Sequence, residues 1–354
     1  MPTFQVSSRV VGDAEPTYFI ADLGANHDGQ LERAKLLICL AKEAGADAAK
    51  FQHFRAPTIV SDRGFQDLGP LSHTAKWKKS VYEVFADCSL PYEWTSELKA
   101  CCDEVGIDFL STPYDLEAVE LLEPLVPAYK IGSGDITWPD ILKRVASKGK
   151  PVILATGASS LCDVQRAVDV IVNENNALAL LQCNTNYSGN SENFDHIHLN
   201  VLRTYQTIFP KLILGLSDHT PGHATVLGAV ALGGRIIEKH FTDDNSRPGP
   251  DHSFAMNPRT WREMVDRTRE LERALGDPQK NVAGNEHDTV VVQRRCLRAT
   301  RDLPAGTILT QNDISALRPA PRDAIFPYEL EQVLQQKTRH FVRQGEHLTW
   351  ARLE

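Results

Sequence analysis

Short apolar runs alternate with longer amphipathic stretches along most of this chain. The amphipathic stretches predict helices over 31–44, 94–105, 116–122, 141–146 and 162–173. The apolar runs are continuous rather than alternating, as expected of strands that are covered on both faces. They lie at 18–23, 48–52, 108–112, 128–131, 151–155, 177–183, 212–216 and 235–240.

Eight short strands interleaved with helices over about 240 residues are typical of a closed (β/α)8 TIM barrel. A doubly wound open sheet is the alternative, but it would use fewer strands. A further helix over 258–275, with Asn257 as its cap, is expected to close the barrel. The segment 61–90 is too long for an ordinary connection, and we expect it to shape the mouth of an active site.

The chain has 354 residues, which is long for one domain. We expect a barrel domain over 1–280, a polar linker over 281–288, and a small domain of short strands and turns over 289–354. A piece of this size needs a partner surface, so we expect the C-terminal domain to dock on the barrel.

Composition narrows the classes of function. The formal net charge is −8, which disfavours nonspecific binding to nucleic acid or membrane surfaces. The first residues lack a basic segment followed by an apolar run, so no signal peptide is expected, and no stretch is apolar enough to span a membrane. The seven cysteines contain no C-x-x-C pair, which indicates reduced thiols and a cytoplasmic protein.

Polar side chains gather at the C-terminal ends of the predicted strands, where barrel enzymes carry their chemistry. His219 and His240 end the seventh and eighth strands, so their imidazoles are expected to meet. Such a pair suits Mn²⁺, Zn²⁺ or a related ion acting as a Lewis acid. Hydrogen-bonded histidines without a metal are the simpler alternative. We expect His27, His223 and His252 in solvated loops near the same rim.

Lys50 and Lys130 also end predicted strands, and two ammonium groups there could clamp a phosphate. Hydroxyl groups at neighbouring strand ends would assist them, from Thr112, Ser133 and Ser217. The rival hypothesis is a metal-independent aldolase that forms a Schiff base on Lys50, Lys130 or Lys239. The histidine pair argues against it, because Schiff-base chemistry needs no such pair.

Four carboxylates complete the rim: Asp22, Asp135, Glu238 and Asp251. Their expected roles are to hold sugar hydroxyls or to transfer protons. Any one of them alone would more often be a structural hydrogen-bond acceptor, so their gathering at one rim carries the prediction.

Read in order, these strand ends resemble the sialic acid (N-acetylneuraminate) synthase family, which includes the legionaminate and pseudaminate synthases. The resemblance covers nearly the whole chain, and several strings in order are far more specific than any one. The last segment, with Arg318 and Pro319, resembles the C-terminal antifreeze-like (SAF) domain of that family. The matching strings are DLGANHDG at 22–29, AGADAAKFQ at 44–52, FLSTP at 109–113, YKIGSGD at 129–135, LATG at 154–157, SDHT at 217–220, EKHFT at 238–242 and RPGPD at 247–251.

The resemblance implies a metal-dependent condensation of phosphoenolpyruvate with an aldose-type aldehyde, giving a 2-keto-3-deoxy sugar acid and phosphate. It implies that His219 and His240 ligate the metal, usually Mn²⁺, with Mg²⁺, Co²⁺ and Zn²⁺ as alternatives. The implied catalytic carboxylates are Asp22, Asp135 and Glu238. The residues implied around phosphoenolpyruvate are Lys50, Thr112, Lys130, Ser133, Thr185 and Ser217. Those implied around the acceptor sugar are Gln52, Tyr187, Asp251 and Arg318.

Some positions depart from the family pattern. Asp22 and Asp135 stand where the family has glutamate, and Ala155 stands where it has serine. Each shortened carboxylate loses about 1.5 Å of reach. We therefore expect an acceptor other than N-acetylmannosamine, and a non-catalytic carbohydrate-binding relative is a further alternative. In the family the counterpart of Arg318 comes from the partner's tail, so a domain-swapped homodimer is implied.

Overall fold

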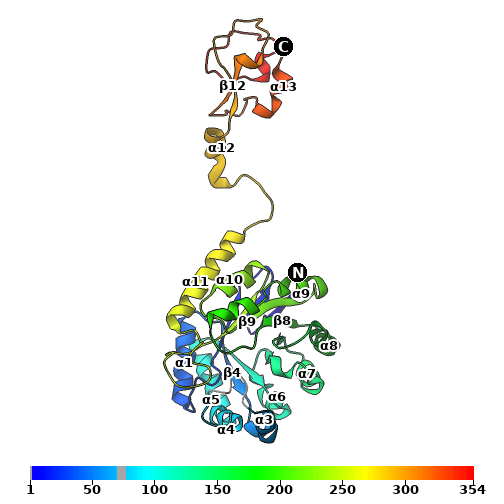
Figure 1. Ribbon diagram of the computed structural model, residues 1–354, viewed down its shortest axis with the longest axis vertical. Helices are drawn as coiled ribbons and strands as arrows, with labels where there is room; N and C mark the ends of the chain where they lie inside the picture. The colour runs from blue at the N-terminus through cyan, green and yellow to red at the C-terminus, as the bar shows by residue number, and fades with distance from the viewer. Residues whose placement is uncertain (1, 70–76) are drawn as a thin grey trace. The chain divides into compact units, whose positions relative to one another are not determined.

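The computed structural model of the protein describes residues 2–69 and 77–354. The chain divides into two compact units, Met1–Gly276 and Asp277–Glu354 (Figure 1). No helix of the described residues is long and apolar enough to cross a membrane.

The first unit is a closed barrel of parallel strands, which confirms the predicted fold and excludes the open sheet. The last strand pairs with the first, with His240 opposite Asp22. The strands in order are β3 (Tyr18–Asp22), β4 (Ala48–His53), β5 (Asp108–Pro113), β6 (Tyr129–Ile131), β7 (Val152–Ala155), β8 (Leu178–Cys183), β9 (Ile213–Asp218) and β10 (Ile236–His240).

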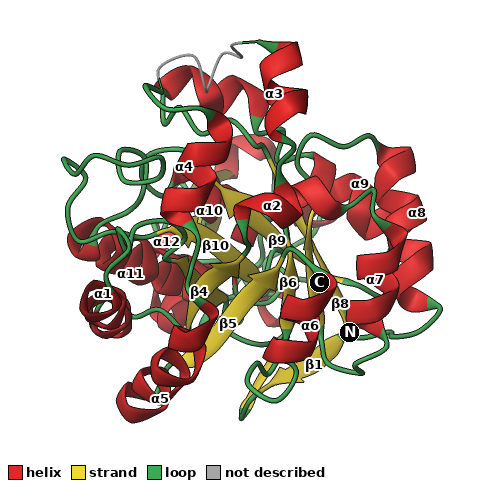
Figure 2. Cartoon of the chain, turned by 90° about the horizontal axis from the view of Figure 1, so that it is seen from below, coloured by secondary structure: helices red, strands yellow, loops and turns green. Residues whose placement is uncertain are grey.

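Helices surround the barrel (Figure 2). Some of them begin at a residue whose side chain accepts a hydrogen bond from the first turn. The Asn257 side chain accepts a hydrogen bond from the Thr260 N–H at 3.1 Å, which fixes the start of α11. The surrounding helices are α1 (Leu31–Glu43), α5 (Thr95–Val105), α6 (Leu116–Leu122), α7 (Pro139–Ala146), α8 (Leu161–Val172), α9 (Val201–Ile208), α10 (Ala224–Ala231) and α11 (Pro258–Leu275).

Alternate residues of each strand serve two separate cores. Phe19 and Ala21 of β3 pack with the helices, whereas Tyr18 and Ile20 belong to the cluster that fills the barrel. Ile236 of β10 belongs to the same inner cluster. Because side chains alternate along a strand, the next inward positions lie at the C-terminal end, where the residues turn polar. The strand pattern thus fixes which side chains face a central site.

The N-terminal residues form a hairpin that the apolar pattern did not predict. It consists of β1 (Thr3–Val6) and β2 (Arg9–Gly12), with Val6 opposite Arg9. Val6 and Val11 are fully buried and join the inner cluster of the barrel. The hairpin therefore adds apolar side chains to the end of the barrel opposite the polar strand ends.

The long segment after β4 is helical rather than a loop. It contains α2 (Ala56–Ile59), α3 (Asp62–Leu68) and α4 (Val81–Cys88), which gather on one side of the barrel (Figure 2), followed by a 3₁₀ turn, η1 (Tyr92–Trp94). Ser61 and Ser80 cap α3 and α4. Residues 70–76 of the predicted 61–90 segment lie outside the described residues.

The second unit has an apolar core of its own. Leu297, Ile325, Val342 and Leu348 are among its fully or almost fully buried residues. The segment predicted as a linker, 281–288, contains a 3₁₀ turn, η4 (Gly284–Glu286), and the start of α12. The longer elements of this unit are α12 (His287–Gln293), β11 (Cys296–Ala299), β12 (Ile314–Leu317) and α13 (Leu330–Val333).

Candidate active site

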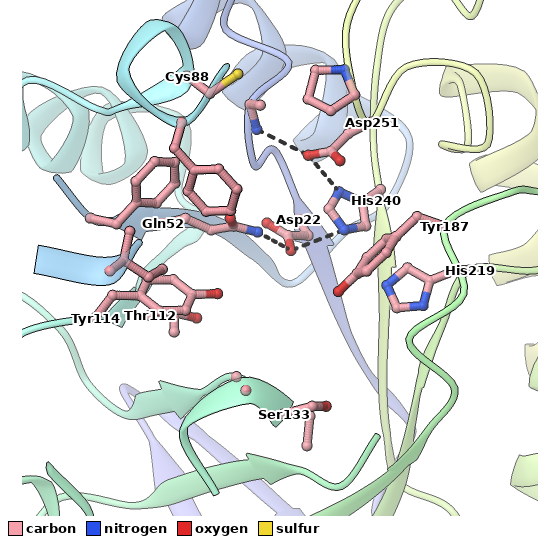
Figure 3. A pocket seen from close by; sticks show the side chains of 18 of the residues that line it. Asp22, Gln52, Cys88, Thr112, Tyr114, Ser133, Tyr187, His219, His240 and Asp251 are labelled. Atoms are coloured by element: carbon pink, nitrogen blue, oxygen red, sulfur yellow. Dashed lines mark hydrogen bonds and ion pairs between the residues drawn. The ribbon is translucent and has the colours of Figure 1, made fainter. Parts of the chain in front are cut away.

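A cavity of about 360 Å³ opens at the C-terminal ends of the barrel strands (Figure 3). It is lined by residues from all eight strands or the turns that directly follow them, so the fold brings distant parts of the sequence together. Most of the predicted site residues line it. They are Asp22, Lys50, Gln52, Thr112, Lys130, Ser133, Tyr187, Ser217, His219, Glu238, His240 and Asp251.

Three predicted site residues do not line this cavity. Asp135 ends the turn η2 (Ser133–Asp135), and its Oδ2 is buried without a hydrogen-bond partner. Thr185 lies next to Gly157, where an added Cβ would come within 2.5 Å of its methyl group and 3.0 Å of the cavity-lining Ser133 hydroxyl. Arg318 belongs to the second unit.

Because side chains alternate along a strand, the residues at the ends of β9 and β10 fall into two sets, one that lines the cavity and one that does not. Ser217 and Glu238 face the cavity, and the Ser217 hydroxyl donates to Glu238 Oε1 at 3.3 Å. Asp218 and Lys239, one residue further along, form a buried ion pair outside the cavity lining. Lys239 also donates to the Thr220 carbonyl at 2.7 Å. Of the lysines considered for a Schiff base, Lys239 therefore does not reach the cavity.

Four charged residues at strand ends line the cavity and are called its charged floor below: Asp22, Lys50, Lys130 and Glu238. Asp22 contacts several neighbouring side chains. Its Oδ2 lies 2.8 Å from Lys50 Nζ and accepts a hydrogen bond from Gln52 Nε2 at 3.0 Å. His240 Nε2 lies 3.5 Å from the same oxygen. Burial alone would raise the pKa of Asp22, but Lys50 and then His240 outweigh it and hold the pKa at about 2. Asp22 is thus an ionised carboxylate that is fully engaged with its neighbours.

The two floor lysines differ in how well they are paired. Burial lowers the pKa of Lys50, but Asp22 and Glu238 outweigh that effect and raise it. Lys130 lies 3.6 Å from Glu238 and has its pKa lowered, chiefly by burial. Both side chains are almost completely buried. A second anion near Lys130 would favour its charged form, so the floor is suited to binding an anionic ligand.

His219 and His240 meet as predicted from their strand positions, with ring centroids 5.5 Å apart. The His219 Nδ1 lies 2.8 Å from the Asn184 carbonyl oxygen, so this nitrogen carries the proton and Nε2 keeps its lone pair. Burial, and then His240, lower the pKa of His219 to about 3, which keeps the ring neutral. His240 Nδ1 is buried without a hydrogen-bond partner.

This donor set could hold a divalent ion through two imidazole nitrogens. Imidazoles with adjacent carboxylates suit Mn²⁺ or Zn²⁺, and Nδ1 of His240, which has no hydrogen-bond partner and lies 3.6 Å from Asp251 Oδ2, is an available ligand. Asp22 and Asp251 are the carboxylates beside His240 (Figure 3). In the described chain, no group of three or more His, Cys, Asp or Glu is arranged to hold a metal, so other ligands would come from substrate or water.

Comparison with known proteins identifies the family. The NeuB family model matches residues 37–280, and the SAF domain model matches residues 294–354. The chain belongs to the NeuB family. The resemblance of its strand-end strings to the sialic acid synthases, and the expectation of a synthase with a SAF domain, are thereby confirmed.

Several named relatives match this NeuB-family chain over most of their length. The N,N'-diacetyllegionaminic acid synthase of Campylobacter jejuni is 35% identical, over 88% of this chain and 93% of its own. The human N-acetylneuraminate-9-phosphate synthase is 34% identical, over 86% of this chain and 84% of its own. The crystal structure of the spore coat polysaccharide biosynthesis protein SpsE of Bacillus subtilis matches with a TM-score of 0.65, at 30% identity and 99% coverage of both chains.

The expectation that His27 and His252 lie in solvated loops is wrong, because both are buried. His252 bridges the Thr242 hydroxyl, at 2.8 Å, and the Asp28 carboxylate, at 2.9 Å. His27 packs edge-on against Trp94, with ring centroids 6.0 Å apart. The contact between His252 and Asp28 binds the loop after β3 to the loop after β10, which the sequence spacing alone did not reveal.

The same two loops bring Asp251 to the histidine pair. Asp251 Oδ2 accepts a hydrogen bond from the Ala25 N–H at 3.3 Å and lies 3.6 Å from His240 Nδ1. Gly24 has a positive φ of 43°, and a Cβ there would lie only 2.8 Å from Asp251 Oδ2. Glycine at position 24 therefore permits this approach.

Sequence reasoning missed Tyr114 and Cys183, which both line the cavity. Tyr114 follows Thr112 by two residues, so strand alternation was the signal that could have identified it. Its hydroxyl lies where Gly132 leaves room, 3.0 Å from the place of a Cβ. Figure 3 shows Tyr114 and Tyr187 on opposite sides of the cavity, with both hydroxyls directed into it.

Proposed function

We propose that this NeuB-family chain condenses phosphoenolpyruvate with the aldehyde of a sugar, giving a 2-keto-3-deoxy sugar acid and inorganic phosphate. Its named relatives include an N,N'-diacetyllegionaminic acid synthase and an N-acetylneuraminate-9-phosphate synthase. The observation that carries the proposal is the cavity floor, where the buried Lys50 and Lys130 share one site with two histidines. Cations for an anionic substrate and ligands for an electrophilic ion are thus close together.

The floor would bind phosphoenolpyruvate through its charged groups. Lys50 and Lys130 supply ammonium groups, and nearby hydroxyls of Thr112, Ser133 and Ser217 supply hydrogen bonds. The methylene carbon of phosphoenolpyruvate forms the new bond to the aldehyde carbon, and the aldehyde oxygen takes up a proton. Water adds at the carbon that bears the phosphate, and the C–O bond to phosphate breaks to leave the keto group.

We propose further that His219 and His240 hold a divalent ion, Mn²⁺ in the first place and Mg²⁺, Co²⁺ or Zn²⁺ as alternatives. When bound, such an ion would act as a Lewis acid on the acceptor carbonyl. The fixed tautomer of His219 and the Nδ1 of His240, which has no hydrogen-bond partner, support this assignment. Asp22 and Asp251 flank His240 and would orient it.

The acceptor is proposed to be an aldehyde other than N-acetylmannosamine. Asp22 is held by Lys50 and Gln52, and Asp135 does not line the cavity. Neither shortened carboxylate is therefore free to hold a sugar hydroxyl at the usual hydrogen-bond distance of about 2.6–3.2 Å. A Schiff base on Lys130 is the second candidate chemistry, because its lowered pKa would favour the nucleophilic amine.

Phosphate release from phosphoenolpyruvate, measured with a panel of sugar aldehydes, tests this function. His219→Ala or His240→Ala should abolish turnover while leaving the thermal unfolding transition in place. His223→Ala is the matched control, because His223 precedes α10 without a side-chain capping hydrogen bond and does not line the cavity. Chelation should remove activity, and Mn²⁺ should restore it.

Full activity after exhaustive chelation would contradict the metal assignment and favour the lysine mechanism. Borohydride trapping of a substrate on Lys130 would then identify the Schiff base. Sugar binding without phosphate release from any aldehyde would indicate a non-catalytic relative.

A further inference from the structure

Tyr114 brings to the cavity a hydroxyl group that has no hydrogen-bond partner among residues 2–69 and 77–354. It is the next inward-facing residue after Thr112, because side chains alternate along a strand. Its hydroxyl is directed into the open space of the cavity (Figure 3). Burial, and then the charge of Asp135, raise the pKa of Tyr114 well above its usual value, so the phenol keeps its proton. Tyr114 therefore offers a hydrogen-bond donor to a ligand.

The position of this hydroxyl follows from three neighbouring strands. Continued past their last pairs, the registers of β5, β6 and β7 place Tyr114, Gly132 and Ala155 side by side. Gly132 has no side chain, and the Tyr114 hydroxyl lies 3.0 Å from the place where its Cβ would be. Ala155 lines the cavity too, but its side chain is only a methyl group. Tyr114 thus carries a hydroxyl from β5 across the end of β6, toward the strand where Ala155 has none.

The groups around this position are suited to an anion. Lys130 is the inward-facing residue before Gly132, and Ser133 directly follows Gly132. The Ser133 hydroxyl accepts a hydrogen bond from the Gly157 N–H at 2.9 Å, so its own proton remains for a ligand. A buried ammonium group, a serine hydroxyl and a phenol hydroxyl are therefore gathered at the end of β6. Donors of this kind bind phosphate oxygens.

We propose that the Tyr114 hydroxyl donates a hydrogen bond to a phosphate oxygen of phosphoenolpyruvate and so supplies the hydroxyl that Ala155 lacks. This inference rests on the proposed condensation. The bond joins a neutral donor to an ionised acceptor, and such bonds are roughly twice as strong as those between neutral groups. Because the phosphate is charged before, during and after the reaction, the hydroxyl contributes to substrate binding more than to turnover.

Tyr114→Phe removes the hydroxyl and keeps the ring. In the phosphate-release assay, we expect KM for phosphoenolpyruvate to rise roughly 10- to 100-fold, the effect of losing a hydrogen bond to a charged group. KM for the sugar aldehyde should stay nearly unchanged. Inhibition by inorganic phosphate, measured against phosphoenolpyruvate, should weaken in the same proportion as KM rises, because inorganic phosphate offers the same oxygens to the site.

A second variant distinguishes a lost hydrogen bond from a disturbed cavity. Ala155→Ser, added to Tyr114→Phe, places a hydroxyl on the neighbouring strand and should recover most of the lost affinity for phosphoenolpyruvate and phosphate. Tyr129→Phe is the matched control, because the Tyr129 hydroxyl donates to the Val119 carbonyl at 2.8 Å and Tyr129 does not line the cavity. This control should leave both quantities unchanged.

The outcomes separate this inference from the condensation itself. If the wild type releases phosphate and Tyr114→Phe changes neither KM for phosphoenolpyruvate nor inhibition by phosphate, the inference is overturned and the condensation stands. A change confined to KM for the sugar would also overturn it, and so would a rise in KM for phosphoenolpyruvate that Ala155→Ser does not reduce. If the wild type releases no phosphate with any aldehyde of the panel, the condensation is contradicted and the inference falls with it.

Discussion

The Asp22 carboxylate shows how one methylene group can alter a site. It accepts a hydrogen bond from Gln52 and pairs with Lys50, so the carboxylate is held by neighbouring side chains of the protein. A glutamate would extend about 1.5 Å further into the cavity. Placement on this scale matters, because a misplacement of about 1 Å can cost 10²-fold in rate.

We therefore predict that Asp22→Glu combined with Asp135→Glu moves acceptor preference toward N-acetylmannosamine. The measurement is the ratio of kcat/KM for N-acetylmannosamine to that for the best aldehyde of the panel, in variant and wild type. The ratio should rise at least several-fold. Wild-type turnover of N-acetylmannosamine near about 10⁴ M⁻¹s⁻¹ would instead make the shortened side chains neutral variation.

The buried carboxyl group of Asp135 leads to a separate prediction about stability. Burial raises its pKa from 3.8 to about 6, although Lys130 opposes the rise. A raised carboxyl pKa means that the ionised form is disfavoured in the folded state, at a cost of roughly 3 kcal/mol when fully ionised. This cost is complete above pH 6 and is lost as the pH falls through 6 toward 3.8.

Asp135→Asn should accordingly increase the free energy of unfolding by up to about 3 kcal/mol at pH 8, and by about half as much at pH 5. Chemical denaturation of both proteins at the two pH values provides the measurement. A difference that does not change with pH would show that ionisation of Asp135 is not its cause.

The site residues could be predicted from the sequence as far as strand ends could be recognised. Lys50, Glu238 and His240 end apolar runs, and the fold places them in one cavity. The parity of turn residues could not be predicted, because alternation stops where the strand stops. Asp135 illustrates this limit, since it lies in the turn that follows β6 and does not line the cavity.

At the scale of elements, the barrel strands and amphipathic helices with a buried face, such as α6, were predictable from the sequence, whereas α3 and α4 were not. The β strands of the barrel are buried on both faces, so their runs are continuously apolar. Helices α3 and α4 have no fully buried residue, so periodicity gives little signal. The capping residues Ser61 and Ser80 were the local sequence signal for the starts of these two helices.

The attachment of β9 and β10 to the helix layer depends on the buried Asp218–Lys239 pair. Thr225 on α10 donates to Asp218 Oδ2 at 2.8 Å, so the pair also ties this helix to the strands. Asp218→Ala would leave an uncompensated ammonium group in the interior. We predict a loss of about 3–5 kcal/mol in the free energy of unfolding.

Chemical denaturation checks this prediction against two controls. Asp266→Ala, which removes an exposed pair with Arg262 on α11, should leave stability nearly unchanged. Asp218→Leu combined with Lys239→Met should recover most of the loss, because apolar replacements of buried ion pairs are often tolerated. Equal losses in the single and double variants would assign the effect to packing rather than charge.

At the scale of the whole molecule, the two units have separate apolar cores, one around the barrel strands and one around Leu297 and Val342. The barrel unit, Met1–Gly276, is therefore expected to fold without the second unit. Arg318, which the family resemblance implies to contact the acceptor sugar, lies in that second unit. Truncation after Gly276 should keep a cooperative unfolding transition and lose phosphate release.

The last prediction concerns which chain supplies Arg318. If tails are exchanged within a homodimer, mixing Arg318→Ala chains with His219→Ala chains produces sites that combine an intact barrel with an intact tail. Random mixing in equal amounts makes half of the dimers mixed, and each mixed dimer has one complete site in two. Activity should then recover to roughly one quarter of the wild-type value, whereas each variant alone stays inactive.

If each tail served its own barrel, no mixed dimer would contain a complete site. Phosphate release is the readout, and two affinity tags purify the mixed dimers. Inactive mixed dimers, obtained in measurable amounts, would exclude exchange of the tails.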